Sequence, residues 1–302
     1  MTVVADKPIL VGPDCLQLGT TTIHRLADIE RIGWPVAAIF RDLTGTALRE
    51  AAASYPAAAD IDAGTLNLSF NSYVIDTSDH LILVDAGIGN GKERPDRPAW
   101  HRRDGDFLHR LQALGYTPED FDFVINTHLH ADHVGWNTAG SGADWRPAFP
   151  NARYIVPGVE LTHWQSLFAD DPHTLHGAYA DSVQPILDAG LYQSVELPAE
   201  IVPGLWLEAA PGHTRGMAVV RLVTDGGQLV FLADVLHSPI QLATPDLTSN
   251  FCVDPAQARA TRRRLLDACA GTDTIVATYH FPLPVFGQIV KAGAGYRFDP
   301  VN

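Results

Sequence analysis

The chain has 302 residues, of which 46% are hydrophobic and 19% are charged. This composition is typical of a globular protein in water, and the length suffices for one large layered domain or two small ones. The formal net charge of −14 argues against nucleic acid or an anionic membrane surface as a partner. The sequence is compatible with a homodimer.

The N-terminus and the cysteines favour a cytoplasmic protein. No hydrophobic run approaches the length of a membrane span, and residues 1–10 lack the apolar core of a secretory signal. The three cysteines are far apart in the chain, and their spacing matches neither a thiol metal motif nor a disulfide framework.

The first third of the chain predicts few elements before a hairpin. Residues 21–26 read as a strand, and the alanine-rich residues 47–59 predict a short helix that ends near Pro56. Residues 66–75 alternate as a half-buried strand does, and after a turn residues 80–84 form a second strand, so a hairpin is expected.

This hairpin ends at Asp85, in a glycine-rich stretch that permits positive φ and close backbone approach. Asp85 has two interpretations. It caps a plain turn, or it lies beneath a metal site and orients a ligand histidine by a hydrogen bond. The motif that follows favours the second interpretation.

Residues 92–106 form a long polar loop, and loops of this length are often lids. The charges of this loop are expected to lie on the solvated surface. Residues 106–114 then predict a helix that stops at Gly115.

The densest group of metal-binding side chains follows a buried strand predicted at residues 121–125. His128, His130, Asp132 and His133 lie within six residues. Side chains alternate along an extended segment, so His128 and His130 point the same way, and the following turn can bring the other two to a second point nearby. The cluster could therefore serve two ions. Structural zinc sites lean on thiolates, whereas imidazole mixed with carboxylate suits a catalytic ion.

A strand at residues 152–156 and a helix at residues 159–168 come next. Trp164 and Phe168 lie one helical turn apart, on one face. Core packing is the first interpretation of this pair, and the wall of a substrate pocket is the second. Leu236 and Phe281 are two further pocket candidates by position, with the same alternative.

The remaining strands each end at a side chain that can bind a metal. Residues 205–210 lead to His213, the hairpin formed by residues 217–223 and 228–232 leads to Asp234, and residues 274–278 lead to His280. Asp254 and Pro255 open a helix between them. Catalytic groups gather in this way on the loops at one edge of a sheet.

These residues, in this order, resemble the metallo-β-lactamase superfamily from about Leu66 onwards. The tail, with Tyr279-His280-Phe281-Pro282 and the closing Pro300-Val301-Asn302, is similar to methyl parathion hydrolase and its lactone- and ester-cleaving relatives. The resemblance implies an α/β fold of the αββα type, with two mixed sheets face to face and helices outside. It also implies that residues 1–302 form one domain, on which residues 1–65 pack as an N-terminal extension.

The resemblance further implies two divalent metal ions, with zinc as the first expectation. One ion would be held by His128, His130 and His213, the other by Asp132, His133 and His280, and Asp234 would bridge them. In the acyl-homoserine lactonases a tyrosine that contacts substrate follows the bridging aspartate by three positions. Here that position is His237, which could still donate a hydrogen bond to a developing oxyanion.

The chemistry expected of such a site is hydrolysis of a lactone, an aryl ester or a phosphotriester. The partner that we expect from this metal site is therefore a small-molecule substrate. Two ions that share a water lower its pKa from about 15.7 towards neutrality, so a bridging hydroxide can attack while Asp132 passes a proton to the leaving group. A β-lactamase and a thioesterase of the glyoxalase II type remain alternatives within the superfamily. A metal-dependent binding or structural protein is the alternative that is not an enzyme.

Overall fold

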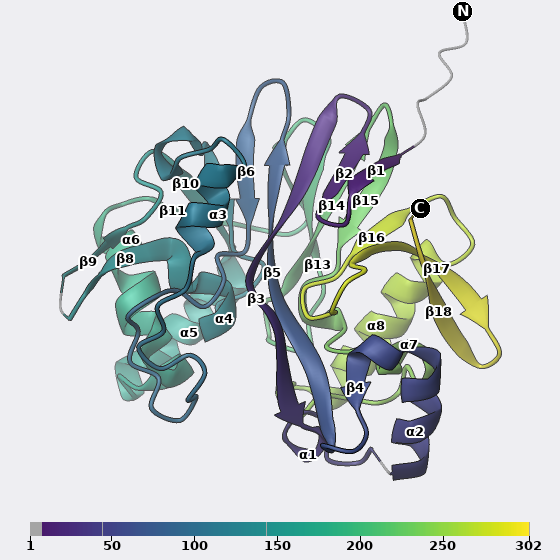
Figure 1. The fold of residues 1–302 in the computed structure, drawn as a ribbon. Coiled ribbons are helices and arrows are strands. Elements are labelled where there is room, and N and C mark those ends of the chain that lie inside the picture. Colours follow the sequence, from purple (N-terminus) through teal and green to yellow (C-terminus); the bar gives the residue numbers. More distant parts are fainter. Residues whose placement is uncertain (1–7, 44, 143, 302) are drawn as a thin grey trace, which may run out of the picture. The chain divides into compact units, whose positions relative to one another are not determined.

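The structure is a computed structural model that describes residues 8–43, 45–142 and 144–301. The chain divides into two compact units. Unit 1 comprises Met1–Thr20, Ile29–Phe70 and Glu200–Asn302, and unit 2 comprises Thr21–Asp28 and Asn71–Ala199 (Figure 1). That the whole chain is one domain stays a prediction. Most of the segment that argued against a secretory signal, residues 1–7, lies outside the described residues.

Unit 2 is built on a mixed sheet. The end of β5 (Thr65–Asp76) pairs antiparallel with β6 (Leu81–Val84), and β6 is followed by the parallel strands β7 (Phe123–Ile125), β10 (Arg153–Pro157) and β11 (Tyr192–Val195). All four residues of β6 are buried and apolar, as is usual for a strand covered on both faces.

The helices of unit 2 follow its strands, and α5 packs against β10 and β11 (Figure 1). They and the short elements beside them are α3 (Phe107–Ala113), η2 (Pro118–Asp120), α4 (Ala131–Val134), η3 (Gly135–Asn137), α5 (Gly158–Asp170), η4 (Thr174–Gly177), η5 (Tyr179–Val183), α6 (Gln184–Asp188) and the hairpin β8 (Thr138–Ser141)–β9 (Asp144–Pro147). The core of this unit joins Val74 and Val124 of the sheet to Phe107, Trp136 and Ile186.

Unit 1 contains a seven-stranded sheet in chain order. Its strands are β12 (Ala199–Val202), β13 (Leu205–Ala209), β14 (Ala218–Thr224), β15 (Gly227–Phe231), β16 (Ile275–Ala277), β17 (Phe286–Ala292) and β18 (Gly295–Pro300). β15 and β16 run parallel, whereas β13–β14–β15 and β16–β17–β18 are antiparallel, so this sheet is also mixed.

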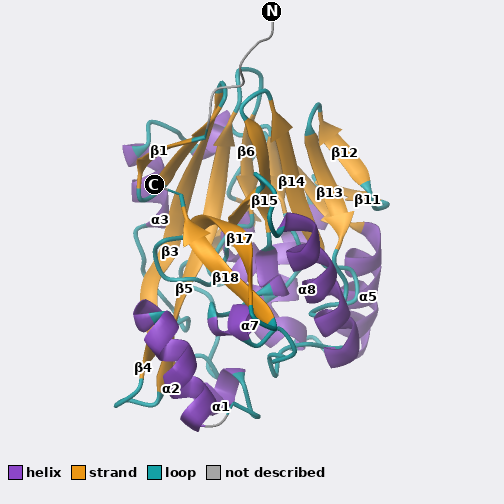
Figure 2. Ribbon diagram, turned by 90° about the vertical axis from the view of Figure 1, so that its right-hand side faces the viewer, coloured by secondary structure: helices purple, strands orange, loops and turns teal. Residues whose placement is uncertain are grey.

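Helix α8 (Pro255–Cys269) packs against β17 (Figure 2). It begins where the sequence predicts, because the Asp254 carboxylate accepts hydrogen bonds from the N–H groups of Ala256 and Gln257 and proline occupies the first helical position. The other elements of unit 1 are β1 (Ile9–Gly12), β2 (Cys15–Leu18), α1 (Val36–Ile39), α2 (Gly45–Ser54), η1 (Pro56–Ala58), β4 (Ala59–Asp60), η6 (Ala233–Val235) and α7 (Ile240–Ala243). β3 (Thr21–Pro35), like β5, contributes residues to both units.

The expected α/β class with mixed sheets is confirmed, and two local predictions are wrong. Residues 66–75 are buried throughout instead of alternating, because β5 is flanked by other strands and covered on both faces. The charges of loop 92–106 are not all solvated. Lys92 and Arg94 are 0% and 1% exposed, because they bond to Asp181, which lies 89 and 87 residues further along the chain. None of the helices in the described ranges is long and apolar enough to cross a membrane.

Candidate functional site

In unit 2, the loops after β6 and β7 leave the sheet side by side. Val84 lies opposite Ile125 in the parallel register, and the Asp85 N–H donates to the Ile125 carbonyl at 2.8 Å. Asp85 has a φ of 55°, a left-handed conformation that is uncommon for residues other than glycine. This turn directs its carboxylate to the histidine motif.

The buried Asp85 carboxylate bonds to two residues of that motif. It accepts hydrogen bonds from the Thr127 N–H at 2.8 Å and the Thr127 hydroxyl at 2.8 Å, and its Oδ2 lies 2.8 Å from His133 Nδ1. Burial raises the pKa of Asp85, while His133 and Thr127 oppose that shift. A proton on His133 Nδ1 makes this contact a hydrogen bond and leaves Nε2 with a lone pair.

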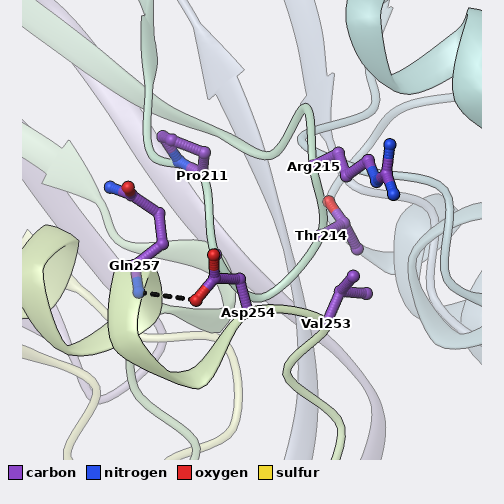
Figure 3. A pocket seen from close by; sticks show the side chains of 7 residues that line it. Pro211, Thr214, Arg215, Val253, Asp254 and Gln257 are labelled. Atoms are coloured by element: carbon purple, nitrogen blue, oxygen red, sulfur yellow. Dashed lines mark hydrogen bonds between the residues drawn. The ribbon is translucent and has the colours of Figure 1, made fainter.

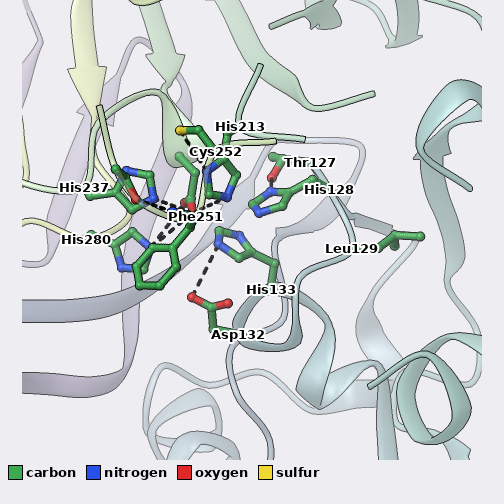
Figure 4. A network of polar contacts seen from close by, with 12 residues as sticks. Thr127, His128, Leu129, Asp132, His133, His213, His237, Phe251, Cys252 and His280 are labelled. Atoms are coloured by element: carbon green, nitrogen blue, oxygen red, sulfur yellow. Dashed lines mark hydrogen bonds and ion pairs between the residues drawn. The ribbon is translucent and has the colours of Figure 1, made fainter. Parts of the chain in front are cut away.

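The motif's imidazoles are packed together in unit 2. The ring centroid of His128 lies 4.7 Å from that of His130 and 4.0 Å from that of His133. Asp132 and His133 belong to α4, and Asp132 Oδ2 lies 3.7 Å from His133 Nε2 (Figure 4). Asp132 is 8% exposed, and His128 and His133 are fully buried. The four metal-binding side chains of the motif therefore form one local group.

Two buried carboxylates that the sequence analysis did not single out hold this part of unit 2. Glu160 Oε1 accepts from the Leu129 N–H at 3.1 Å and from Trp164 Nε1 at 2.6 Å. Asp28 accepts from the N–H groups of Ile88 and Gly89 and from the indole of Trp136. The signal in the sequence is weak, because each carboxylate is far along the chain from the loop that it holds.

In unit 1, three strand ends bring imidazoles to one carboxylate. Asp234 lies on η6 after β15, His213 follows β13, and His280 follows β16. Asp234 Oδ2 is 3.0 Å from His213 Nε2 and 3.4 Å from His237 Nε2, and Oδ1 is 3.3 Å from His280 Nε2. All four residues are at most 3% exposed. Figure 4 shows the three histidines of this group from close by.

Burial and the carboxylate act on these imidazoles with different outcomes. Burial lowers the pKa of His213, but Asp234 more than offsets it and raises the pKa to about 10. Burial dominates at His237 and lowers its pKa to about 3, with Asp234 opposing. The His237 ring is therefore neutral at pH 7, and one of its nitrogens carries a lone pair.

Contacts outside the ring of imidazoles fix the positions of His213, His280 and Asp234. His280 Nδ1 lies 3.1 Å from the Ser69 carbonyl oxygen, and Cys252 Sγ lies 3.7 Å from His213 Nδ1. The buried Arg262 guanidinium donates to the carbonyls of Val235, Pro245 and Leu247, which fastens the segment that carries Asp234. Arg262 was not singled out from the sequence, since an arginine in a helix is usually exposed.

A cavity of about 160 Å³ lies beside the His213 turn in unit 1 (Figure 3). It is lined by Pro211, Gly212, Thr214, Arg215, Val253, Asp254 and Gln257. Two exposed charges of opposite sign line this cavity, Arg215 and Asp254, and the Asp254 carboxylate also accepts hydrogen bonds from two N–H groups of α8.

The four predicted pocket residues lie in different surroundings. Trp164 stands beside His130, with ring centroids 5.8 Å apart, and Phe168 stacks on Tyr179 at 4.5 Å. Leu236 and Phe281 are 0% and 1% exposed and belong to the apolar core of unit 1. The core interpretation that the sequence left open describes the placement of these last two residues, whereas Trp164 lies next to the motif.

Comparison with known proteins identifies relatives along most of the chain. The profile of the metallo-beta-lactamase superfamily matches residues 68–280. An N-acyl homoserine lactonase from Bacillus cereus is 29% identical over 179 residues, which cover 55% of this chain and 63% of that protein. An N-acyl homoserine lactonase from Bacillus thuringiensis is 25% identical over 248 residues, which cover 78% of this chain and 87% of that protein.

Two solved structures share the fold. The hydrolase AbOPH, of the beta lactamase superfamily, is 24% identical with a TM-score of 0.79, and the match covers 100% of this chain and 99% of that one. AidC, a dizinc quorum-quenching lactonase in complex with the product N-hexanoyl-L-homoserine, is 22% identical with a TM-score of 0.77, over 99% of this chain and 98% of that one. At these identities the likeness establishes the fold and not the substrate.

Proposed function

The chain belongs to the metallo-β-lactamase superfamily, and from this membership we propose that it is a dinuclear metal-dependent hydrolase that cleaves a lactone, an aryl ester or a phosphotriester. The comparisons support a hydrolase that uses divalent metal, with lactonases among its relatives. A lactone is the first substrate class to test, because two of these relatives are N-acyl homoserine lactonases.

The proposal assigns two ions to seven side chains. His128, His130 and His213 would hold one ion, Asp132, His133 and His280 would hold the other, and Asp234 would contact both. Imidazole and carboxylate without thiolate is a donor set that suits zinc and leaves a position open for substrate. We therefore propose zinc for both positions.

The hydrogen bonds within each unit fit this assignment. Asp85 accepts from His133 Nδ1, and the Ser69 carbonyl lies within reach of His280 Nδ1, so in both rings the proton is held on Nδ1. The Nε2 atoms are then left with the lone pairs that a metal ion needs.

Bound divalent ions would supply the Lewis acidity that makes hydroxide available from water near pH 7. The protein's own groups would do the remainder. Asp234 brings a negative charge among buried imidazoles, and Asp132, which is 8% exposed, would hold the proton that the leaving group takes up. Trp164, beside His130, offers an apolar wall for an acyl or aryl group.

The observation that carries this proposal is the convergence of the His213 and His280 imidazole nitrogens on the buried Asp234 carboxylate, at 3.0 and 3.3 Å. Two imidazoles that approach a single carboxylate, with all three residues at most 3% exposed, are hard to explain by packing. They are expected where the carboxylate and the nitrogens share a cation.

The test is a substrate panel with metal-reconstituted protein. N-acyl homoserine lactones, aryl esters and phosphotriesters would be assayed beside nitrocefin and S-lactoylglutathione, each with and without prior chelation. We expect chelator-sensitive turnover in the first three classes. Selective turnover of nitrocefin or of S-lactoylglutathione would favour a β-lactamase or a thioesterase instead. His173→Ala, which removes an exposed histidine, is the matched control and should retain full activity.

A further inference from the structure

The imidazole ring of His237 is buried without a hydrogen bond among the described residues. The residue is about 1% exposed, and among the residues that the structure describes neither ring nitrogen has a hydrogen-bond partner. A buried polar group without a partner is costly and rare in folded proteins. The backbone around it is well held, because the His237 N–H donates to Gln241 Oε1 at 2.7 Å and Gln241 donates onward to the Leu247 carbonyl. The ring is thus held in place without being bonded.

The ring is placed among atoms that bind metal ions. It stacks on His280, with centroids 5.4 Å apart and planes 14° from parallel, and Phe251 lies on it at 6.0 Å (Figure 4). His237 Nε2 lies 3.4 Å from Asp234 Oδ2, and His280 Nε2 lies 3.3 Å from Asp234 Oδ1. One ligand atom from each of these three residues falls within 4.8 Å of the other two.

These separations have the size that a shared ion imposes. Two ligand atoms at about 2.1 Å from one zinc ion, at a tetrahedral angle, are separated by roughly 3.4 Å. A hydrogen bond between an imidazole and a carboxylate would be shorter, at about 2.7 to 2.9 Å. The 3.4 Å contact between His237 and Asp234 is therefore too long for the bond that would satisfy the ring, and it has the length expected between two ligands.

We propose that His237 is a metal ligand that forms, with Asp234 and His280, a three-residue position for a divalent cation. All three residues belong to unit 1. The seven residues of the proposed function do not include His237, so the inference adds a ligand to that set. It also replaces the role in which His237 donates a hydrogen bond to a developing oxyanion.

A substitution by tyrosine separates the two roles of His237. His237→Tyr removes the nitrogen ligand but keeps a hydrogen-bond donor at the position where the lactonases carry a tyrosine. If His237 is a ligand, the affinity for one equivalent of metal falls by about a hundredfold or more, since loss of residues that merely orient ligands already costs roughly 10–100-fold. If His237 serves only as a donor, metal affinity stays at the wild-type value.

The measurement is the titration of the metal-free full chain with Co²⁺, which gives affinity, stoichiometry and the visible absorption of the coordinated ion. Phe251→Leu is the matched control, because Phe251 packs on the same ring and has no ligand atom. We expect its affinity and spectrum to stay at the wild-type values while both change in His237→Tyr. His237→Gln, smaller and also without an imidazole, repeats the test if tyrosine prevents folding.

A combined variant keeps this inference distinct from the proposed function. His128→Ala together with His130→Ala disables the unit 2 motif, and the inference expects one Co²⁺ to remain bound and to be lost when His237→Gln is added. Two ions in the wild type with unchanged affinity and spectrum in His237→Tyr would overturn the inference and leave the proposed function in place. A wild type that binds no metal would overturn both.

Discussion

Two largely buried carboxylates, Asp181 in unit 2 and Asp234 in unit 1, differ in the side chains that surround them. In unit 2, Lys92 Nζ donates to the Thr138 hydroxyl at 2.5 Å and to the Asp181 carbonyl at 3.1 Å, and Arg94 bonds both oxygens of the Asp181 carboxylate at 2.7 and 2.8 Å. In unit 1, the Asp234 carboxylate faces the imidazoles of His213, His237 and His280 at 3.0 to 3.4 Å.

The difference lies in where the positive charge comes from. Asp181 obtains its counter-charge from the chain, so this cluster is complete once the protein folds. Asp234 is surrounded by imidazoles, one of which, His213, has its pKa raised by this carboxylate, and a divalent metal ion would displace the proton from that imidazole. Burial of a charged side chain therefore does not by itself indicate a functional group. The kind of partner that the buried charge has indicates it.

The largest expected effect is that of Asp234→Asn. The amide keeps the shape but removes the charge at the centre of the unit 1 group, and the loss of several kcal/mol of metal stabilisation corresponds to about a 10³-fold fall in kcat/KM. Zinc should also no longer raise the melting temperature, as it should in the wild type. Asp246→Asn, at an exposed carboxylate paired with Arg263, is the control and should leave both measurements unchanged. An Asp234→Asn protein that is active and is stabilised by zinc would show that the charge of Asp234 is not needed for metal binding.

Arg94→Met should lower the stability of the fold without lowering the affinity for metal. It leaves the Asp181 carboxylate, which is only 13% exposed, without its two-point partner, and removing one member of a buried ion pair costs about 3 kcal/mol of unfolding free energy. Urea denaturation measures this loss. Metal affinity should be retained. Arg102→Met, on the same loop but in an exposed pair with Glu93, should cost less than about 0.5 kcal/mol. Equal losses in the two variants would show that the cluster is not a stabilising element.

Asp85→Asn tests a residue with features of both groups. Its carboxylate is satisfied within the chain, by Thr127 and His133, yet one of those partners is a proposed ligand. We expect a loss of metal affinity of roughly 10–100-fold, because an amide accepts a hydrogen bond from His133 more weakly and no longer stabilises its charge. Competition against a chelator measures this. Asp79→Asn, on the exposed turn before β6, is the control. A loss of stability with unchanged metal affinity would place Asp85 with the structural cluster.

The sequence predicts what strand ends and short motifs determine. Asp85 is expected near the histidine motif because both follow buried strands, and the parallel register of β6 and β7 does bring it to His133. The start of α8 follows in the same way from Asp254 and Pro255, since a cap and a first-turn proline act on neighbouring residues. Features that depend on residues close together in the sequence can therefore be predicted from it.

Contacts between residues that are far apart in the sequence cannot be predicted in this way. Lys92 and Arg94 are predicted to be surface charges, because no residue near them in the sequence indicates that they bond to Asp181. Glu160 reads as an ordinary helical residue, although it bonds to the backbone of Leu129 inside the motif. Such partners are chosen by the tertiary fold, so a single sequence predicts the ligand types of a site better than the groups that hold them.

The smallest expected effect is a change in the pH dependence of stability. Burial lowers the pKa of Lys92 to about 7 in the folded protein, with Asp181 opposing, from 10.5 as the ordinary value. Between these two values the unfolded chain binds more protons than the folded chain, so the free energy of unfolding rises with pH. From pH 7 to pH 8 this one group should contribute about 1 kcal/mol, because one unit of pKa difference corresponds to about 1.4 kcal/mol.

Lys92→Met should remove that rise. The difference in unfolding free energy between wild type and variant, measured by urea denaturation at both pH values, should therefore change by about 1 kcal/mol in favour of the wild type at pH 8. Lys291→Met is the matched control, because Lys291 is exposed and its pKa is raised, so it stays protonated at both pH values. A difference that does not change with pH would mean that Lys92 stays charged in the folded state. The Trp145 ring, whose centroid lies 3.6 Å from Nζ, would then be the group that holds the charge in place.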